Sequence, residues 1–270
     1  MVRQNRISWE ECIVKLKQDA KNAELVQDCF FDDPLFNAAQ RYYLSEEWEE
    51  IRNLVGIRGG KALDVGAGLG ISSFALAKDG WKTVALEPDP SSIVGAEAIR
   101  RLALEADVSI EVVENWGEDL PFDDESFELV HCRQVLHHAR DLIGLCREIG
   151  RVLKPGGKFI ATREHVVGGV KDLKKFLGHH PLHRFYGGEN AYTLDQYCSS
   201  IRGAGIRITQ TLNPFESNIN LFPRTIRDIK KNLATKTGIP TWLIPKIIFN
   251  LRGGFSKTPG RLYSFVGIKS

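Results

Sequence analysis

Apolar positions follow two different spacings along the chain, and the spacing changes near residue 60. Residues 8–30 have helical spacing, and Ser45 followed by acidic residues predicts the start of a helix that continues to about Val55. Beyond residue 60, short apolar runs alternate with longer amphipathic segments. This change predicts an N-terminal helical cap, residues 1–58, before an α/β domain, residues 59–270.

The α/β domain is predicted from the order of its elements. Strands are expected at 61–65, 82–87, 108–113, 127–132, 158–163, 206–212 and 261–268. Helices are expected at 71–79, 91–105, 141–153 and 195–203. Strands that alternate with helices through short connections form a parallel sheet with helices on both faces. The mostly helical pattern before the last strand predicts an insertion at about 217–257.

Composition places the chain among ordinary globular proteins, since 43% of its 270 residues are hydrophobic and 26% are charged. The longest apolar patch, 242–251, is interrupted by Pro245 and Lys246, which argues against a membrane-spanning helix. The first residues contain no apolar stretch of signal-peptide length. The five cysteines form no C-x-x-C pair, so neither a disulfide framework nor a zinc site is expected. These features favour a cytoplasmic location.

Charge is unevenly distributed, although the net charge is only +2. Residues 1–60 contain 8 Lys and Arg against 11 Asp and Glu, whereas residues 217–270 contain 10 against 1. Such a basic region attracts nucleic acid, anionic lipid or a phosphorylated substrate, and a solvated basic face is the alternative. The insertion at 217–257 carries most of this charge. A lid over a substrate pocket, a membrane-surface contact and an oligomer interface all remain open for it.

A glycine-rich turn follows the first predicted strand. Gly66, Gly68 and Gly70 permit left-handed backbone angles and close backbone approach to a ligand. A helix then begins, with its free N–H groups facing the turn. Glu87 ends the next strand, where it can accept two hydrogen bonds from the hydroxyls of a ribose. This combination predicts a site for a nucleotide-type cofactor.

Six sequence blocks between about residues 60 and 160 resemble the class I S-adenosylmethionine-dependent methyltransferases, in particular the small-molecule branch that includes quinone-biosynthesis and biotin-pathway enzymes. The blocks lie at 63–70, 87–89, 118–122, 126–130, 136–138 and 151–157. The resemblance implies a Rossmann-like, seven-stranded, mostly parallel sheet whose last strand is antiparallel. It also implies S-adenosyl-L-methionine as the cofactor.

By this resemblance, the methionine part of the cofactor would be held by the side chain of Asp64 and the backbone of Gly66, Ala67 and Gly68. Glu87 would accept the ribose hydroxyls. Arg133 follows the fourth strand, where the family places contacts to the methionine end or to the substrate. Its guanidinium could clamp a carboxylate, and a surface ion pair is the alternative.

The position that would face adenine departs from the family pattern. Family members usually have an acidic residue for the adenine amino group where this chain has Trp116, beside Gly117. Trp116 could instead stack on the purine. Asn115 or a backbone carbonyl would then accept the amino group.

Three other functions compete for the same features. A dehydrogenase typically has G-x-G-x-x-G, whereas this chain has G-x-G-x-G at 66–70. A noncatalytic cofactor-binding or scaffold protein would use the basic insertion to dock on an anionic partner. A nucleic-acid methyltransferase would also explain the basic region, but the N/D-P-P-Y/F block of amino-directed enzymes is absent from the sequence. The sequence favours a small-molecule methyltransferase.

All seven histidines lie between residues 131 and 183. This stretch includes the ends of two predicted strands, and ligands of open parallel sheets bind beyond the carboxyl ends of strands. His165 is predicted to be the catalytic base or substrate anchor, and the neighbouring Glu164 is predicted to be catalytic as well. A capping or surface position is the alternative for each histidine. Residues of metal-binding type also occur nearby, at Glu164, His165, His179, His180 and His183. Their spacing matches no metal signature, so no metal site is predicted.

The acceptor is expected to be a small polar molecule. Residues 186–192 place two glycines and several hydrogen-bonding side chains in one loop. Such a loop suits a polar substrate such as a sugar, although the glycines could simply turn the chain. A sugar-containing or phosphorylated acceptor and transfer to oxygen are the resulting expectations.

Overall fold

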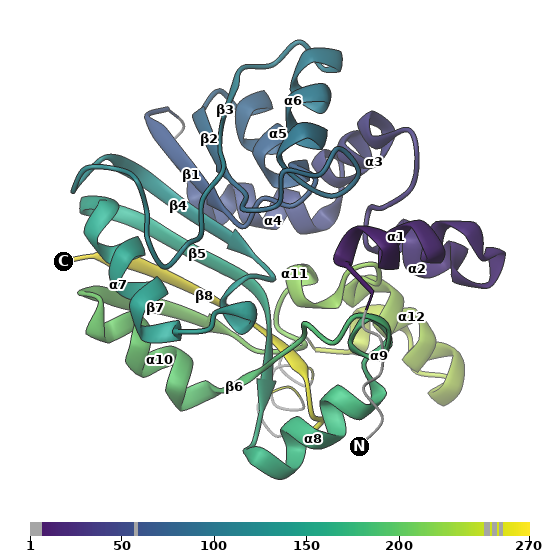
Figure 1. The fold of residues 1–270 in the computed structure, drawn as a ribbon. Helices are drawn as coiled ribbons and strands as arrows, with labels where there is room; N and C mark the ends of the chain where they lie inside the picture. Colours follow the sequence, from purple (N-terminus) through teal and green to yellow (C-terminus); the bar gives the residue numbers. More distant parts are fainter. Residues whose placement is uncertain (1–6, 57–58, 246–248, 250–252, 254–255) are drawn as a thin grey trace.

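The computed structural model describes residues 7–56, 59–245, 249, 253 and 256–270 (Figure 1). Its sheet runs in the order β3-β2-β1-β4-β5-β8-β7, and a short strand, β6, pairs with β5. The strands are β1 Lys61–Val65, β2 Lys82–Leu86, β3 Ile110–Val113, β4 Phe127–Arg133, β5 Leu153–Val167, β6 Tyr192–Thr193, β7 Ile206–Leu212 and β8 Arg261–Lys269. Neighbours are parallel except where β8 pairs with β5 and β7. The predicted Rossmann-like sheet is therefore confirmed, with β6 as an eighth strand.

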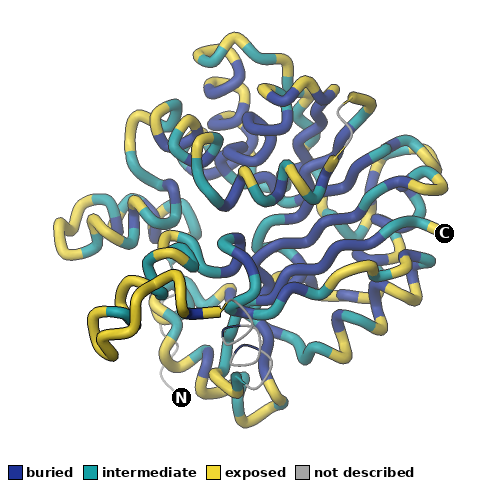
Figure 2. Tube along the Cα trace, turned by 180° about the vertical axis from the view of Figure 1, so that it is seen from behind, coloured by how far each residue is buried: buried dark blue, intermediate teal, exposed yellow. Residues whose placement is uncertain are grey.

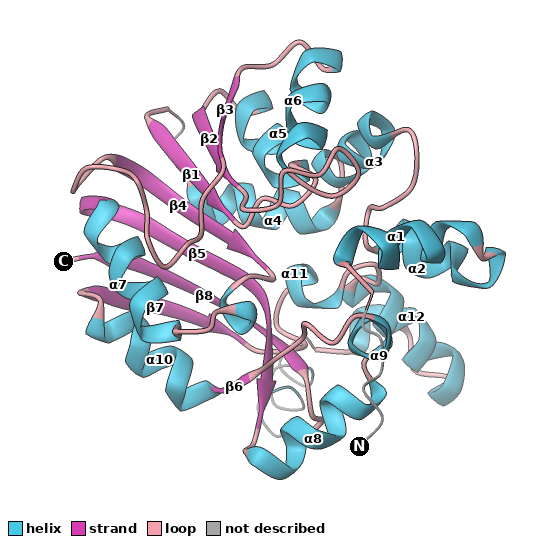
Figure 3. Cartoon of the chain, viewed as in Figure 1, coloured by secondary structure: helices cyan, strands magenta, loops and turns pink. Residues whose placement is uncertain are grey.

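Helices cover both faces of this sheet, with α4, α5 and α6 on one face and α7 and α10 on the other (Figure 3). The α-helices up to the middle of the chain are α1 Trp9–Gln18, α2 Ala23–Asp28, α3 Leu35–Tyr43, α4 Glu46–Val55, α5 Ile71–Lys78, α6 Ala96–Glu105 and α7 Leu142–Val152. Those that follow are α8 Val170–His179, α9 Pro181–Phe185, α10 Leu194–Gly203, α11 Asn218–Leu221 and α12 Ile226–Thr237. Three 3₁₀ turns, η1 Ala20–Asn22, η2 Leu136–His138 and η3 Thr241–Leu243, complete the described elements.

Two hydrophobic clusters lie on opposite faces of the sheet because strand side chains alternate in direction. In β5, Phe159 and Ala161 belong to the cluster that contains α7 and α10, whereas Ile160 belongs to the cluster that contains α3, α4 and α5. The central strands are accordingly buried along most of their length (Figure 2). The apolar runs of the sequence thus become strands covered on both sides.

The structure differs from the sequence prediction at several element boundaries. The helical region expected at 8–30 is divided into α1, η1 and α2. The helix expected from residue 91 begins at Ala96, because the Ser91 hydroxyl accepts hydrogen bonds from the backbone N–H groups of Ile93 and Val94 and holds a turn there. Helices α3, α8 and α9 were not predicted from the sequence.

Strand β5 is much longer than the predicted 158–163 and contains a bulge. Ala161 pairs with Phe265 of β8 and Glu164 pairs with Tyr263, so β5 has one more residue than its partner in this interval. Arg163 lies in the bulge with φ +61°. After the bulge, the even-numbered Val166 faces the α7 and α10 cluster that odd-numbered residues faced before it. The bulge therefore reverses which residues point to which face.

The predicted insertion at 217–257 contains α11, α12 and η3 among its described residues. The positions 246–248, 250–252 and 254–255 of that prediction lie outside the described residues. Within the part that the structure describes, no helix has the length and apolar character needed to cross a bilayer.

Candidate active site

The glycine turn after β1 lies against the segment that follows β4. Gly66, Gly68 and Gly70 have φ values of +63°, +55° and +75°, which favour glycine. A Cβ added to Gly66 would lie 2.9 Å from Cγ2 of Val135, so the turn and this segment pack without room for a side chain. A Cβ on Gly68 would meet no atom within 4 Å. The backbone at Gly68 therefore borders open space.

Glu87 follows β2 and its carboxylate joins the glycine turn. One oxygen accepts a hydrogen bond from the Gly68 N–H at 2.7 Å, and the other accepts one from the Asp89 N–H at 3.0 Å. The residue is 8% exposed, and burial raises the pKa of its carboxyl to about 7. Each oxygen keeps a lone pair for a further donor.

Asp64 lies below the turn in a buried polar network. Its carboxylate accepts a hydrogen bond from the Ser73 hydroxyl at 2.6 Å and lies 3.1 Å from Nδ1 of His131. The ring of Trp48 packs edge-on against His131. The Asp64 carboxylate is thus held by protein groups from α5 and β4 while the residue still lines the cavity. The sequence did not predict this use of His131.

Arg133 forms a buried ion pair in place of the surface pair considered from sequence. Its Nε and one terminal nitrogen bind the two carboxylate oxygens of Glu47 at 2.8 and 3.1 Å. The guanidinium also lies over the rings of Phe30 and Tyr42. The side chains of Arg133 and Glu47 are 12% and 0% exposed. Arg133 borders the cavity, and two of its five N–H donors bond to Glu47 while a third bonds to the side-chain oxygen of Gln134.

Trp116 and Gly117 lie at the rim of the same cavity. Trp116 is 56% exposed, and the Arg140 guanidinium lies 5.0 Å from the centroid of its indole. The Asn115 side chain donates to the Asp119 carbonyl and accepts from the Trp116 N–H. Both polar atoms of the Asn115 side chain thus make local turn contacts, and its oxygen keeps one lone pair.

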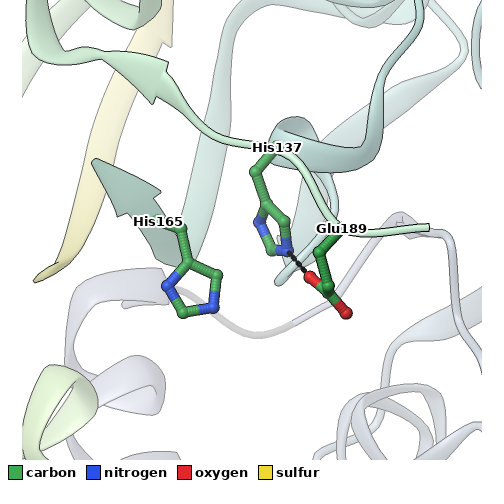
Figure 4. Close-up of side chains that lie close together, drawn as sticks. All are labelled: His137, His165 and Glu189. Carbon is green, nitrogen blue, oxygen red and sulfur yellow. Dashed lines mark ion pairs between the residues drawn. The ribbon is translucent and has the colours of Figure 1, made fainter. Parts of the chain in front are cut away.

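Three groups converge on the other side of the cavity: His137 from η2, His165 from β5 and Glu189 from the 186–192 loop (Figure 4). Nitrogen and oxygen atoms of the three lie within 4.8 Å of one another. Burial lowers the pKa of both His137 and His165 well below the ordinary imidazole value. His165 lines the cavity as the sequence predicted, whereas His137 and Glu189 were not singled out as its partners.

Glu164 does not occupy the catalytic position predicted for it. Its side chain is fully buried, and its carboxylate accepts hydrogen bonds from the backbone N–H groups of Val135, Leu136 and His137 at 3.0–3.1 Å. It also lies 2.7 Å from Nδ1 of His137. Burial raises the pKa of Glu164. Glu164 positions the η2 turn from beneath and does not line the cavity, because the β5 bulge directs it to the core side.

The remaining histidines divide between the cavity and the surface. His180 lies 4.0 Å from Glu189 and its ring centroid is 5.4 Å from that of His165. His179 is exposed and its Nδ1 bonds to the Lys175 carbonyl within α8. The structure therefore does not bring together the five residues of metal-binding type that were considered from the sequence. One signal could have identified Glu189: it lies in the polar loop that the sequence associates with the acceptor.

A cavity of about 550 Å³ connects these groups, a volume within the usual range for small-molecule sites. It is bordered by the glycine turn, the Glu87 region, the histidine group and the N-terminal helices. The N-terminal contribution consists of Trp9, Leu25, Cys29, Phe30 and Phe31. One continuous space therefore borders both the glycine turn and the histidine group.

Comparison with known proteins gives a family match for part of the chain. Residues 63–161 match the family model of a methyltransferase domain. The uncharacterized methyltransferase YcgJ of Bacillus subtilis is 29% identical over 120 residues, which are 44% of this chain and 46% of that protein. The ubiquinone biosynthesis O-methyltransferase of Aliivibrio fischeri is 32% identical over 108 residues, 40% of this chain and 45% of that protein. The matched region thus covers about half the length of these relatives.

Solved structures show the same fold. The crystal structure of YcgJ superimposes with a TM-score of 0.57 at 22% identity, covering 83% of this chain and 97% of that one. The geranyl diphosphate C-methyltransferase of Streptomyces coelicolor gives a TM-score of 0.60 at 14% identity, covering 82% and 74%. Residues 63–161 therefore match a methyltransferase domain, and most of the chain shares the fold of these methyltransferase structures.

Proposed function

We propose that the chain transfers the methyl group of S-adenosylmethionine to an oxygen atom of a small polar acceptor. One observation carries this proposal: a single cavity is lined both by the glycine turn with Glu87 and by the group of His137, His165 and Glu189. The first set suits a nucleoside-type cofactor and the second suits a hydroxyl. Relatives named ubiquinone biosynthesis O-methyltransferases support oxygen as the methylated atom.

The residues of the turn fit the proposed cofactor. A Cβ at Gly68 would enter open space beside the cavity, which is the space that a bound ribose requires. The Glu87 carboxylate, held by two backbone N–H groups, has lone pairs left for the two ribose hydroxyls. Trp116 offers an exposed indole face for the purine at the rim.

The chain's contribution to the reaction is alignment and exclusion of water. When bound, S-adenosylmethionine supplies a methyl group on a positively charged sulfur. Holding two reactants in the correct geometry can lower a barrier by about 7–11 kcal/mol. His165 accepts through Nε2, because its Nδ1–H donates to the Gly260 carbonyl at 2.8 Å. Nε2 can therefore orient an acceptor hydroxyl and receive its proton.

Calorimetric titration of the protein with S-adenosylmethionine, S-adenosylhomocysteine and NAD tests the cofactor. Binding of the first two but not NAD is the expected result, and binding of NAD alone would overturn the proposal. His165→Ala should keep the affinity for S-adenosylhomocysteine and lower kcat with an oxygen acceptor. His179→Ala is the matched control, because His179 is an exposed histidine outside the cavity. Equal loss in both variants would remove His165 from the acceptor site.

We also propose that α12 and η3 form a contact with an anionic surface. Helix α12 buries none of its residues and carries Arg227, Lys230, Lys231 and Lys236 against Asp228. Beside it, Trp242 is 80% exposed and Leu243 is 51% exposed. Cationic residues next to exposed aromatic and aliphatic side chains are typical of segments that lie on anionic lipid.

Vesicle co-sedimentation tests this contact. The protein should sediment with phosphatidylglycerol vesicles more than with phosphatidylcholine vesicles, and Trp242→Ala should weaken the binding. Leu104→Ala is the control, because Leu104 is 85% exposed on α6, outside the basic region. Binding that is independent of lipid charge and of Trp242 would refute the contact.

A further inference from the structure

We propose that His137, His165 and Glu189 bind a divalent transition-metal ion, which holds the acceptor oxygen. This inference rests on the proposed function for the role of the ion, whereas the metal site itself can be tested without methyl transfer. The three side chains come from η2, β5 and the 186–192 loop and face one another across the cavity (Figure 4). Their ligand atoms lie within 4.8 Å of one another.

Each histidine is oriented through the ring nitrogen that a metal would not use. His137 directs Nδ1 to the Glu164 carboxylate at 2.7 Å, and His165 directs Nδ1 to the Gly260 carbonyl at 2.8 Å. Metal-binding histidines almost always donate their second N–H to a carboxylate or a backbone carbonyl, which fixes the tautomer and the ring direction. Both imidazoles therefore present Nε2 as the available ligand atom.

Glu189 is a buried carboxylate with loose partners. It is 8% exposed, and one oxygen lies 3.7 Å from Nε2 of His137 and 3.8 Å from Nε2 of His138. Its hydrogen bond from the Tyr186 hydroxyl is long, at 3.3 Å. A direct imidazolium–carboxylate bond would be about 2.7–2.9 Å. A buried negative charge is costly unless a nearby positive charge or short hydrogen bonds stabilise it, and these contacts are too long to do so. A cation between Glu189 and the imidazoles would stabilise the carboxylate.

The donor set defines the class of ion. Two imidazoles and one carboxylate occur in catalytic zinc sites and in non-haem iron sites, whereas magnesium prefers oxygen ligands alone. Metal–ligand distances of about 2.0–2.2 Å bring donor atoms to within about 4 Å of one another, so small side-chain rotations close the present arrangement. Three protein ligands leave coordination positions for an acceptor oxygen.

The ion gives the cavity a specific chemical use. A metal-bound hydroxyl loses its proton to solvent at a pH nearer neutrality than a free one does, so the ion takes the place of Nε2 of His165, which is then a ligand, in ionising the acceptor. The acceptor would therefore be a molecule whose hydroxyl or enol oxygen binds a metal, and the oxygen bound to the ion would be the one that is methylated. The acceptor class of the proposed function is thereby narrowed from any small polar molecule to a molecule with an oxygen atom that can bind a divalent cation.

Cobalt titration of tag-free, EDTA-treated protein tests the site without cofactor or acceptor. The expected result is one Co²⁺ per chain with visible d–d absorption, displaced by Zn²⁺. His137→Ala, His165→Ala and Glu189→Gln should each weaken Co²⁺ binding by about 100-fold. Losing only an outer-shell partner of a ligand weakens metal binding by about 10–100-fold, and losing a ligand itself should cost at least as much. His179→Ala should bind Co²⁺ as the parent protein does.

Titration with S-adenosylhomocysteine separates the possible failures. Retained cofactor affinity in the three ligand variants shows that they are folded, so their loss of Co²⁺ supports the site. Absence of Co²⁺ binding in the parent protein, or binding that the three variants leave unchanged, overturns the metal site. Co²⁺ binding in a protein that does not bind S-adenosylmethionine would leave the metal site in place and refute the methyl transfer.

Discussion

The Glu87 carboxyl titrates in the pH range in which the protein would bind its cofactor, because burial raises its pKa to about 7. Ribose hydroxyls bind the ionised form, which is the minor form below that pH. Affinity for a ribose ligand should therefore rise about tenfold between pH 6 and pH 8, as the ionised fraction of Glu87 rises, and should be nearly constant above pH 8. Calorimetry with 5′-methylthioadenosine measures this, because that ligand has no group titrating in the range.

Glu87→Gln provides the control for this pH dependence, since an amide does not titrate. Its affinity should be weaker and should not change between pH 6 and pH 8. A parent protein whose affinity is constant, or falls, over the same range would show that Glu87 is not the ribose acceptor.

Alanine substitutions at Gly66 and Gly68 distinguish the energetic cost of backbone strain from that of steric conflict. Both have positive φ, so alanine at either position should cost about 1–2 kcal/mol of unfolding free energy. At Gly66 the new methyl group would also lie 2.9 Å from Val135, which should add about 1–3 kcal/mol. Urea denaturation of the two variants without ligand measures the difference. Equal losses would mean that Val135 moves aside without cost.

At the scale of elements, Asp79 joins the N-terminal helices to the sheet domain. This C-cap residue of α5 accepts hydrogen bonds from Trp48 Nε1 and Arg52 Nε of α4, at 3.0 and 2.7 Å, and from the Tyr43 hydroxyl of α3 at 3.1 Å. Its side chain is 5% exposed. Three donors from two helices therefore depend on one carboxylate.

Asp79→Ala should lower the unfolding free energy by about 3 kcal/mol, because it leaves the Arg52 charge without its partner in a largely buried setting. Chemical denaturation measures the change. Glu105→Ala, at an exposed position at the end of α6, should change stability by no more than about 0.5 kcal/mol. A loss at Asp79 as small as this control would show that α4 is held by its apolar face alone.

The sequence predicts elements well where local pattern and local structure agree. Strands β1 and β7 have the predicted bounds, and α4 starts after Ser45, whose hydroxyl accepts a hydrogen bond from the Trp48 N–H. Strand β5 continues past its predicted end at residue 163 because pairing with β6 and β8 holds the last residues of the strand. Those partners are distant in sequence, so local spacing could not indicate the extension.

The same distinction applies to the candidate site. The glycine turn and Glu87 could be predicted because each follows a strand and acts through its own backbone surroundings. Arg133 could not be assigned correctly, because its partner Glu47 is 86 residues away and reaches it only through the packing of α4. His165 was placed in the cavity region, but its neighbour Glu189 becomes apparent only when the 186–192 loop is folded over β5.

At the scale of the whole molecule, α1 and α2 form a small cluster separate from the two main clusters. Their contacts to the rest of the chain include Trp9 against Tyr186 and the Ser91 hydroxyl bonded to Glu10. Trp9 also borders the cavity. A region with few buried apolar contacts opens at low free energy, so α1 and α2 are expected to open before the sheet does.

Ligand binding should therefore slow amide hydrogen exchange in α1 and α2 as well as in the glycine turn. S-adenosylhomocysteine at about 100 times its Kd should also raise the unfolding free energy by about 2.7 kcal/mol. Exchange measured by mass spectrometry with and without the ligand checks the first effect, and NAD serves as the negative control. Protection confined to the glycine turn would show that the N-terminal helices do not close over the cofactor.

The bulge at Arg163 has a consequence for how this site could change by mutation. Glu164 and His165 are adjacent in sequence, yet one lies beneath the η2 turn and the other faces the cavity. Loss of the bulge with no residue removed would shift the strand end by one residue against β8, reverse its alternation and exchange the two side chains. The cavity would then present a carboxylate where it had an imidazole, while the seven-strand path and the glycine turn stayed in place. A substitution at Arg163 that abolished the bulge would thus alter acceptor chemistry without changing either Glu164 or His165.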